Sequence, residues 1–239
     1  MKHMLFAGSV ILGIIAWGCD NSTDSKPTSG TLAMSSKYTT STLAKAGQSA
    51  AVDSVKITKA RFILRDIKFK SPKGDSSNFR TAPMILELNL NGSVQSVGSI
   101  TVPFGSYSRI EYDVHRVEQP EISSLPASEQ AQFAEFLADE RYSIIINGIV
   151  YTGAVPDTFA YRSKVDAKQK VDFDPAIDVS EAAPAVNATV AISSANWFKD
   201  RTTGATINPN VPESSDIDNN LKESIKIYKD NNKDGSKDN

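Results

Sequence analysis

The stretch Val186-Asn-Ala-Thr-Val-Ala-Ile192 has the most regular pattern in the chain, because an apolar residue occupies every second position. Such alternation is typical of a β-strand with one face in a core. Before it lie three more strand-like segments, at residues 142–152, 158–165 and 169–173, each bounded by Gly, Pro, Asp or Asn. Many short strands with turn residues between them predict an antiparallel β-sandwich, Ig-like or transthyretin-like, with one or two short helices.

A second alternating stretch, Met84-Ile-Leu-Glu-Leu-Asn-Leu-Asn-Gly92, ends in the dipeptide typical of tight hairpins. We therefore expect this strand to turn at residues 91–92 and to pair with a return strand over residues 94–102. Residues 54–70 also alternate, but their apolar positions change parity near residues 58–60 and again at Ile67. Such changes predict bulges or bends in a long strand. Residues 31–37 are the candidate first strand, and residues 38–51 are expected to form a loop.

Two segments have helical spacing. Residues 126–139 place Phe133, Phe136 and Leu137 at positions i, i+3 and i+4, which predicts a helix against the sandwich. Residues 215–228 carry an apolar stripe at Ile217, Leu221, Ile225 and Tyr228. Ser215 and Asp218 are spaced like a capping box, so we expect this second helix to begin at Ser215. Trp197 and Phe198 lie between the last predicted strand and this helix, and we expect them to close one end of the core.

The N-terminus predicts export from the cytoplasm. Lys2 is followed by an apolar run from Met4 to Trp17, which is too short for a stable membrane span and is typical of a signal peptide. The junction Ile15-Ala-Trp-Gly-Cys19 resembles the lipobox of bacterial lipoproteins. That resemblance implies cleavage before Cys19 and a diacylglyceryl group on its thiol. An ordinary secretory signal or an uncleaved anchor are the alternatives.

Composition limits the chemistry of the mature chain. Loss of Lys2 with the signal changes the net charge from −2 to −3, which does not favour nucleic acid as a partner. Cys19 is the only cysteine, and His115 is the only histidine left after cleavage. These counts exclude a zinc site built from several Cys or His ligands and a catalytic cysteine thiol. We expect four parts: a signal peptide at 1–18, a tether at 19–30, a β-sandwich at 31–228 and an Asp/Asn-rich tail at 229–239.

The tail resembles the opening of an EF-hand calcium loop. Oxygen donors alternate before a glycine, as positions 1, 3 and 5 of that loop require. The predicted ligands are Asp230, Asn232, Asp234, Ser236 and Asp238. The bidentate Glu of the twelfth position would fall after Asn239, so we expect weak Ca²⁺ binding. A solvated polar terminus is the alternative.

Three other candidate sites have less support from the sequence. His115 continues the alternation of the polar residues Glu111 and Asp113 in its strand, so we expect it to face solvent. Asp172 and Asp174 share one face and are expected on the wet side of an edge strand. A sugar-stacking platform would be built around Trp197, with Tyr107, Tyr112, Tyr151 and Tyr161 as further members.

Two further stretches resemble uncharacterised bacterial lipoprotein domains of β-sandwich type. The first runs from Pro83 through the Pro-Phe-Gly-Ser-Tyr turn at residues 103–107 to Ile110, and the second is Asn196-Trp-Phe198 with the helix and tail that follow. The resemblance implies the fold and no activity. We expect a lipid-anchored cell-envelope protein with a non-catalytic binding or structural role. A surface carbohydrate-binding or adhesive module is the alternative, and an enzyme using His115 is the third.

The predicted partners are the membrane, through the lipid, and an envelope protein or a glycan. The anchoring membrane would be the outer membrane, on its periplasmic face or at the cell surface, or the inner membrane. Asp20 resembles the inner-membrane retention signal of enteric bacteria, and other lineages interpret this position differently. The sequence therefore leaves the leaflet open.

Overall fold

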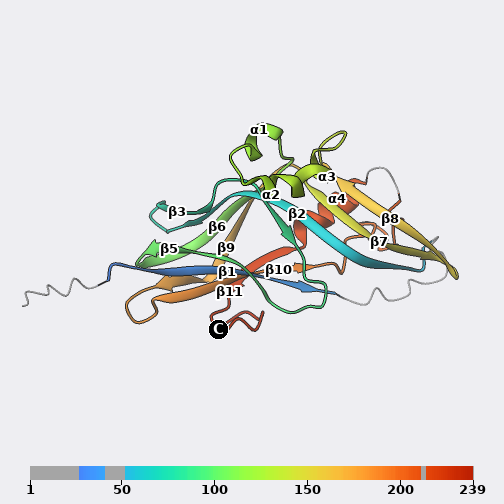
Figure 1. Ribbon diagram of the computed structural model, residues 1–239. Coiled ribbons are helices and arrows are strands. Elements are labelled where there is room, and N and C mark those ends of the chain that lie inside the picture. Colours follow the sequence, from blue (N-terminus) through green and yellow to red (C-terminus); the bar gives the residue numbers. More distant parts are fainter. Residues whose placement is uncertain (1–26, 41–51, 211–213, 239) are drawn as a thin grey trace, which may run out of the picture.

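The computed structural model describes residues 27–40, 52–210 and 214–238. Its strands form two sheets packed face to face (Figure 1). The four-stranded sheet has the order β11 (Ile225–Lys229), β10 (Ala185–Ser193), β1 (Ser29–Thr39), β5 (Gln95–Pro103). The seven-stranded sheet has the order β8 (Val155–Ser163), β7 (Ile144–Thr152), β2 (Ser54–Lys70), β6 (Gly105–Val114), β9 (Ala167–Val179), and both β3 (Ser76–Arg80) and β4 (Met84–Glu87) also pair with β2.

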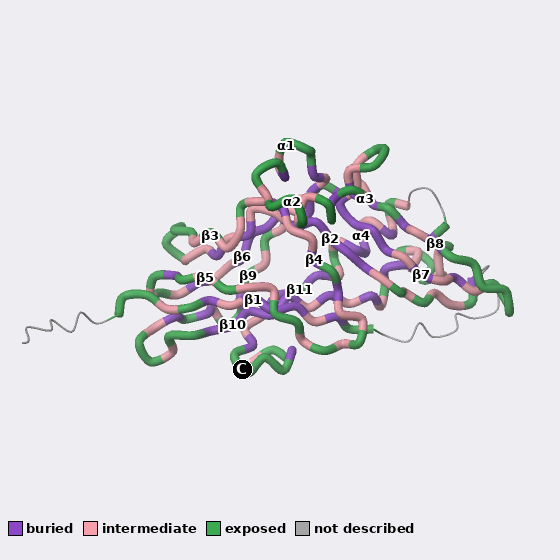
Figure 2. The backbone as a smooth tube through the Cα atoms, viewed as in Figure 1, coloured by how far each residue is buried: buried purple, intermediate pink, exposed green. Residues whose placement is uncertain are grey.

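The predicted β-sandwich is confirmed, and one pair of strands departs from its antiparallel pattern. β1 and β10 run parallel, whereas the other paired strands are antiparallel. The main core lies between the sheets and is built from residues between Leu32 and Ile227 (Figure 2). A chain that begins at Asp20 therefore keeps every residue of this core.

Strand β10 has the apolar alternation that the sequence predicts. Val186, Ala188, Val190 and Ile192 are buried against the opposite sheet. Asn187 and Thr189, on the other parity, are also buried, because the C-terminal tail packs over them. The outer face of this strand is therefore a polar interface within the chain.

The two predicted irregularities of the long strand are confirmed in β2. Its register shifts against β7 between Ile57 and Lys59, and against β6 between Arg65 and Lys68. Asp66 has a φ of 50°, in the left-handed region that accompanies such bulges. Because the second shift lies between them, Phe62 and Phe69 both face the core although their spacing is odd.

The predicted hairpin at Asn91-Gly92 is wrong. β4 pairs with β2 in the seven-stranded sheet, whereas β5 pairs with β1 in the four-stranded sheet. Residues 88–94 carry the chain from one sheet to the other, and Gly92 turns there with a φ of 79°. Turn chemistry identified the bend, but the partners of the two strands depend on long-range packing.

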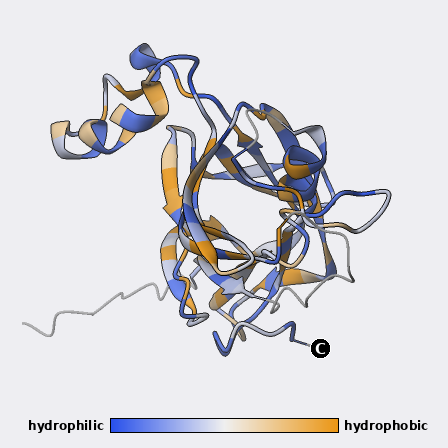
Figure 3. Ribbon diagram, turned by 90° about the vertical axis from the view of Figure 1, so that its right-hand side faces the viewer, coloured by the Kyte–Doolittle hydropathy of each residue, from blue (hydrophilic) through white to orange (hydrophobic). Residues whose placement is uncertain are grey.

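The first predicted helical segment consists of short turns on the outside of the seven-stranded sheet (Figure 3). They are α2 (Ala127–Gln130), a 3₁₀ turn η1 (Ala131–Phe133) and α3 (Ala134–Leu137), and a further short helix, α1 (Gln119–Ile122), precedes the predicted range. Ile122, Phe133 and Phe136 pack with Ile63 and Ile145 of the sheet in a second, smaller core. This segment thus covers part of the sheet's outer face and leaves the rest open.

The second predicted helix is only half correct. α4 (Ser215–Glu223) begins one residue after its N-cap Ser214, whose side chain accepts the N–H of Ile217. Ile225 and Tyr228 belong to β11 and not to the helix. The sequence Ile225-Lys-Ile-Tyr-Lys also alternates, and pairing with β10 favours the strand.

Trp197 and Phe198 are buried, as the sequence predicts for residues that close one end of the core. The Trp197 ring lies 5.9 Å from the Phe62 ring and 6.2 Å from the Tyr38 ring, between centroids. Tyr38 belongs to one sheet and Phe62 to the other, so the indole fills the space where the sheets meet. Among the helices in the described part of the chain, none has the length and apolar content needed to cross a membrane.

Candidate functional site

The tail is held on the four-stranded sheet by Asp230. This residue is fully buried, and its carboxylate accepts the Thr189 hydroxyl at 2.6 Å. The same carboxylate accepts the N–H of Asp234 at 3.1 Å and the N–H of Gly235 at 2.9 Å. These bonds close residues 230–235 into a loop, and Gly235 occupies the predicted sharp turn with a φ of 76°.

Further polar contacts fix the loop to β1 and β10. Asn187 donates to the Asp230 carbonyl at 2.9 Å and accepts the Ser35 hydroxyl at 3.0 Å. Lys37 donates to the carbonyls of Asp234 and Gly235, at 3.1 Å each. The tail is therefore an integral part of the body and covers part of the outer face of its smaller sheet.

The predicted calcium ligands lie in this loop and in the residues just after it, and several of them accept hydrogen bonds from its backbone. Asp238 accepts the N–H of Asn231 at 2.7 Å, and Asn232 accepts the N–H of Asp234 at 3.0 Å. Hydrogen bonds from Ser236 and Asn232 hold the pKa of Asp234 below its usual range. Within residues 27–40, 52–210 and 214–238, no three His, Cys, Asp or Glu side chains are placed to hold a metal ion. Calcium binding by this loop stays a prediction, and the Lys37 ammonium already supplies a positive charge beside it.

His115 does not face solvent, so that expectation is wrong. It is 8% exposed, because β6 ends at Val114 and the parity of the strand no longer applies. Nε2 lies 2.8 Å from a Glu121 oxygen, and Nδ1 lies 3.4 Å from an Asp166 oxygen. Arg65 also pairs with Glu121. The imidazole is thus held between two carboxylates at the base of the helical segment.

Glu121 bonds to His115, to Arg65 and to the backbone at the start of α1. Burial raises the pKa of its carboxyl, but hydrogen bonds from His115 and from the Glu118 N–H, together with the charges of His115 and Arg65, outweigh burial and lower it. The carboxyl also closes the capping box of α1. Its ionised form therefore positions both the histidine and the helix start.

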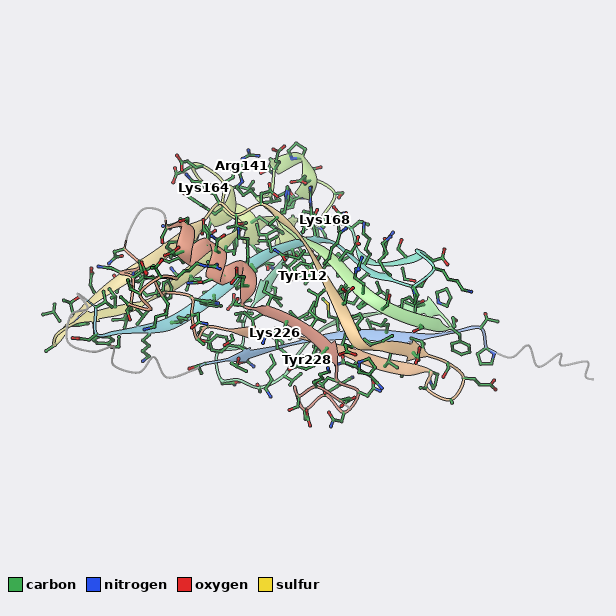
Figure 4. All side chains as sticks on the ribbon, turned by 180° about the vertical axis from the view of Figure 1, so that it is seen from behind. Tyr112, Arg141, Lys164, Lys168, Lys226 and Tyr228 are labelled. Carbon is green, nitrogen blue, oxygen red and sulfur yellow. The ribbon has the colours of Figure 1, made fainter. Side chains whose placement is uncertain are left out.

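The predicted sugar-stacking platform has no common surface. Trp197 is fully buried, and Tyr107, Tyr112 and Tyr161 are buried as well, whereas Tyr151 is half-buried. Tyr112 lies between the sheets (Figure 4), where burial raises its pKa. Trp197 presents no exposed ring face to a ligand, so its observed role is packing.

The two paired aspartates lie where the sequence predicts them. β9 is an end strand of its sheet, and Asp172 and Asp174 are exposed on it. The Asp172 carboxylate accepts a hydrogen bond from Nε of Arg109 at 2.6 Å, and this bond raises the pKa of Arg109. Asp172 is therefore an ion-pair partner of a cation on the neighbouring strand.

Around this pair lies a charged surface that the sequence pattern did not single out. We call it the lysine face and define it by residues that share the outer parity of β2, β6 and β9: Lys68, Lys70, Arg109, Glu111, Asp113, Lys168, Lys170 and Asp172. It occupies the part of the seven-stranded sheet that the helices leave open. The repeated Lys-x-Lys pattern at 68–70 and 168–170 is a sequence signal that could have indicated this surface. Only the register shows that β6 brings the two strands together.

A cleft of about 420 Å³ lies at the end of the sandwich where the N-terminal segment enters. It is bounded by the β2–β3 turn at residues 71–77 and by residues 103–107 between β5 and β6. The N–H of Phe104 donates to the Thr28 carbonyl at 3.0 Å, which places the chain's entry beside this cleft. The lysine face begins next to it, at Lys70 and Arg109.

Fold and site together define a two-sheet β-sandwich protein with a packed polar tail and a cationic outer face. No protein-family model matches the chain, and no curated protein matches it. Among solved structures, MbnP from Methylosinus trichosporium is similar at 9% sequence identity, over 78% of this chain and 87% of that chain, with a TM-score of 0.39. A similarity at this level assigns neither a family nor a function.

Proposed function

We propose that the chain is a lipid-anchored protein of the bacterial cell envelope, whose β-sandwich has a non-catalytic binding or structural role. The observation that carries the proposal is the charged start, apolar run and small residue before the lone Cys19. Cys19 lies outside the described residues, so its lipidation has to be tested directly. The packed core between Leu32 and Ile227 supports a body that folds independently of such an anchor.

The surroundings of His115 support a non-catalytic role. Both ring nitrogens face carboxylates, and a general base for a serine hydroxyl needs one nitrogen directed at that hydroxyl. An enzyme using His115 remains the third hypothesis, and turnover that is lost in His115→Ala would favour it. A carbohydrate-binding module remains the second. Binding on a glycan array that is lost in Trp197→Ala, without loss of folding, would favour that hypothesis.

The direct test of the anchor is metabolic labelling. A bacterium that produces the full chain is grown with labelled palmitate, and the wild type is compared with Cys19→Ser. We expect label and membrane association in the wild type, and an unlabelled precursor of higher mass in the variant. Serine has almost the size of cysteine and lacks only the thiol, so Cys19→Ser is a matched control. Absence of label from the wild type, with identical fractionation of both forms, contradicts the proposal.

A further inference from the structure

The lysine face carries more positive charge than its own carboxylates can neutralise. It contains five cationic side chains and three carboxylates, in a chain whose net charge is −2, and one of those carboxylates, Asp113, also pairs with Arg65 outside the face. Two rows cross the three strands in register. In one row Glu111 lies between Lys68 and Lys170, and in the other Arg109 lies between Lys70 and Asp172.

Glu111 shows how incomplete the neutralisation is. Its side chain is 9% exposed, and the ammonium groups of Lys68, Lys168 and Lys170 lie 3.9 to 4.0 Å from its oxygens. Three cations thus gather around one carboxylate at the outer limit of ion-pair distance. Cations this close repel one another, and a further anion from outside relieves that repulsion.

The face has a boundary on the side of the helical segment. Arg65, the next cation along β2, is met by Asp66, Asp113 and Glu121. On β9, the side chains of Lys168 and Lys170 are 53% and 56% exposed. Figure 4 shows Lys168 at the end of β9 near the helical segment, with Lys226 on the strand of the other sheet. The excess positive charge is therefore local and open to solvent.

The face lies within reach of the tether. The chain enters at Ser29, opposite Pro103, and β6 begins at Gly105. Arg109 and Glu111 lie four and six residues further along β6, which corresponds to ~13 to 20 Å in a strand. Ser29 is the tenth residue after Cys19, and a chain of this length spans up to ~35 Å. A lipid on Cys19 can therefore hold the face against the membrane that contains the lipid.

We infer that the lysine face binds the anionic headgroups of the membrane that anchors the protein. The inference rests on the proposed lipid anchor, and charge complementarity selects the occupant. Phosphate-bearing headgroups are the anionic surface that such an anchor places beside the body. Polybasic surfaces near an anchor bind anionic lipid mainly through charge, with about a fivefold gain in affinity per cation. The anchor and the face thus form two linked attachments to one surface.

The test uses the chain from Asp20 onward, which has no lipid and keeps the whole core. Its binding is measured by sedimentation with vesicles of phosphatidylcholine, with and without about one-third phosphatidylglycerol. We expect at least about tenfold stronger binding to the anionic vesicles, and loss of the preference near 1 M salt, where charges are screened beyond ~3 Å. This chain has no lipid anchor. Failure to bind the anionic vesicles would therefore contradict the inference about the lysine face, and it would not bear on the proposed anchor.

Matched variants locate the binding. The double variant Lys168→Glu with Lys170→Glu should weaken binding to anionic vesicles at least about tenfold. The control, Lys56→Glu with Lys226→Glu, changes the net charge of the chain by the same amount. It should change binding to these vesicles less than about twofold. Glu111→Gln should strengthen binding about fivefold, because it removes the internal carboxylate. The fluorescence of buried Trp197 reports whether each variant is folded. Equal losses in both double variants, or binding to soluble dextran sulfate without binding to vesicles, would overturn the inference.

Discussion

Trp197 shows how a single aromatic residue can be placed correctly in the fold and incorrectly in the function. Its bulk predicted the closure of the core, and the fully buried ring confirms this. The same ring also suggested a sugar platform, which needs an exposed face. Its Nε1 has no hydrogen-bond partner among the described residues, so apolar packing against Phe62 and Tyr38 accounts for its contribution to stability.

We expect Trp197→Ala to lower the free energy of unfolding by about 3 to 5 kcal/mol, because it leaves a large cavity in the core. Trp197→Phe should cost less, since a ring still fills part of the space. Urea denaturation followed by circular dichroism measures both. A loss below about 1 kcal/mol for the alanine variant would show that the indole is not a packing residue.

Glu121 predicts a pH dependence of stability. Its folded-state pKa is lowered from 4.5, so the unfolded chain binds more protons between the two values. The stability that it contributes is present above its ordinary pKa and is lost as the pH falls through the lowered value. We therefore expect wild-type unfolding free energy to fall more steeply than that of Glu121→Gln below about pH 4.5.

At neutral pH the same substitution should cost about 1 kcal/mol, because Arg65 and the Glu118 N–H lose a charged acceptor. Denaturant titrations at a series of pH values provide both quantities. Parallel pH profiles for the two proteins would contradict the assigned role of Glu121.

At the scale of elements, the tail is the segment whose structure departs most from its sequence pattern. Asp, Asn and Lys without apolar residues are typical of a solvated end, yet Asp230 is buried on β10. Three hydrogen bonds to its carboxylate hold the tail on the sheet, where other segments are held by apolar contacts. Removing it in Asp230→Ala should lower the unfolding free energy by about 1 to 3 kcal/mol, because buried donors lose their acceptor.

Weak calcium binding by this loop is best tested without removing that structural carboxylate. Asp234→Asn keeps an oxygen for the Ser236 N–H and removes only the charge. We expect about 5 mM Ca²⁺ to raise the wild-type melting temperature slightly, and this rise to be absent in Asp234→Asn. Asp75→Asn, in the β2–β3 turn, is the control and should keep the rise. If calcium leaves the melting curve of the wild type unchanged, the prediction of calcium binding is wrong, and the Lys37 ammonium is the cation beside the loop.

For the whole molecule, alternation in sequence predicted which strands exist and which residues face the core, because each strand has one apolar face. It did not predict the partners of β4 and β5 or the strand character of β11, which depend on contacts far along the chain. Parity failed for His115 because the strand ends before it. The lysine face shows the same limit, since only the register of β2, β6 and β9 brings its cations together.

The central claim concerns the whole chain: a β-sandwich body held at a membrane by a lipid on Cys19. Mass spectrometry of the N-terminal peptide, from protein isolated from the membranes of a bacterium that produces the full chain, tests it most directly. The account predicts a peptide that begins at Cys19 and carries the mass of a diacylglyceryl group. A mature N-terminus at any other residue, or a peptide beginning at Cys19 with an unmodified thiol, would contradict it.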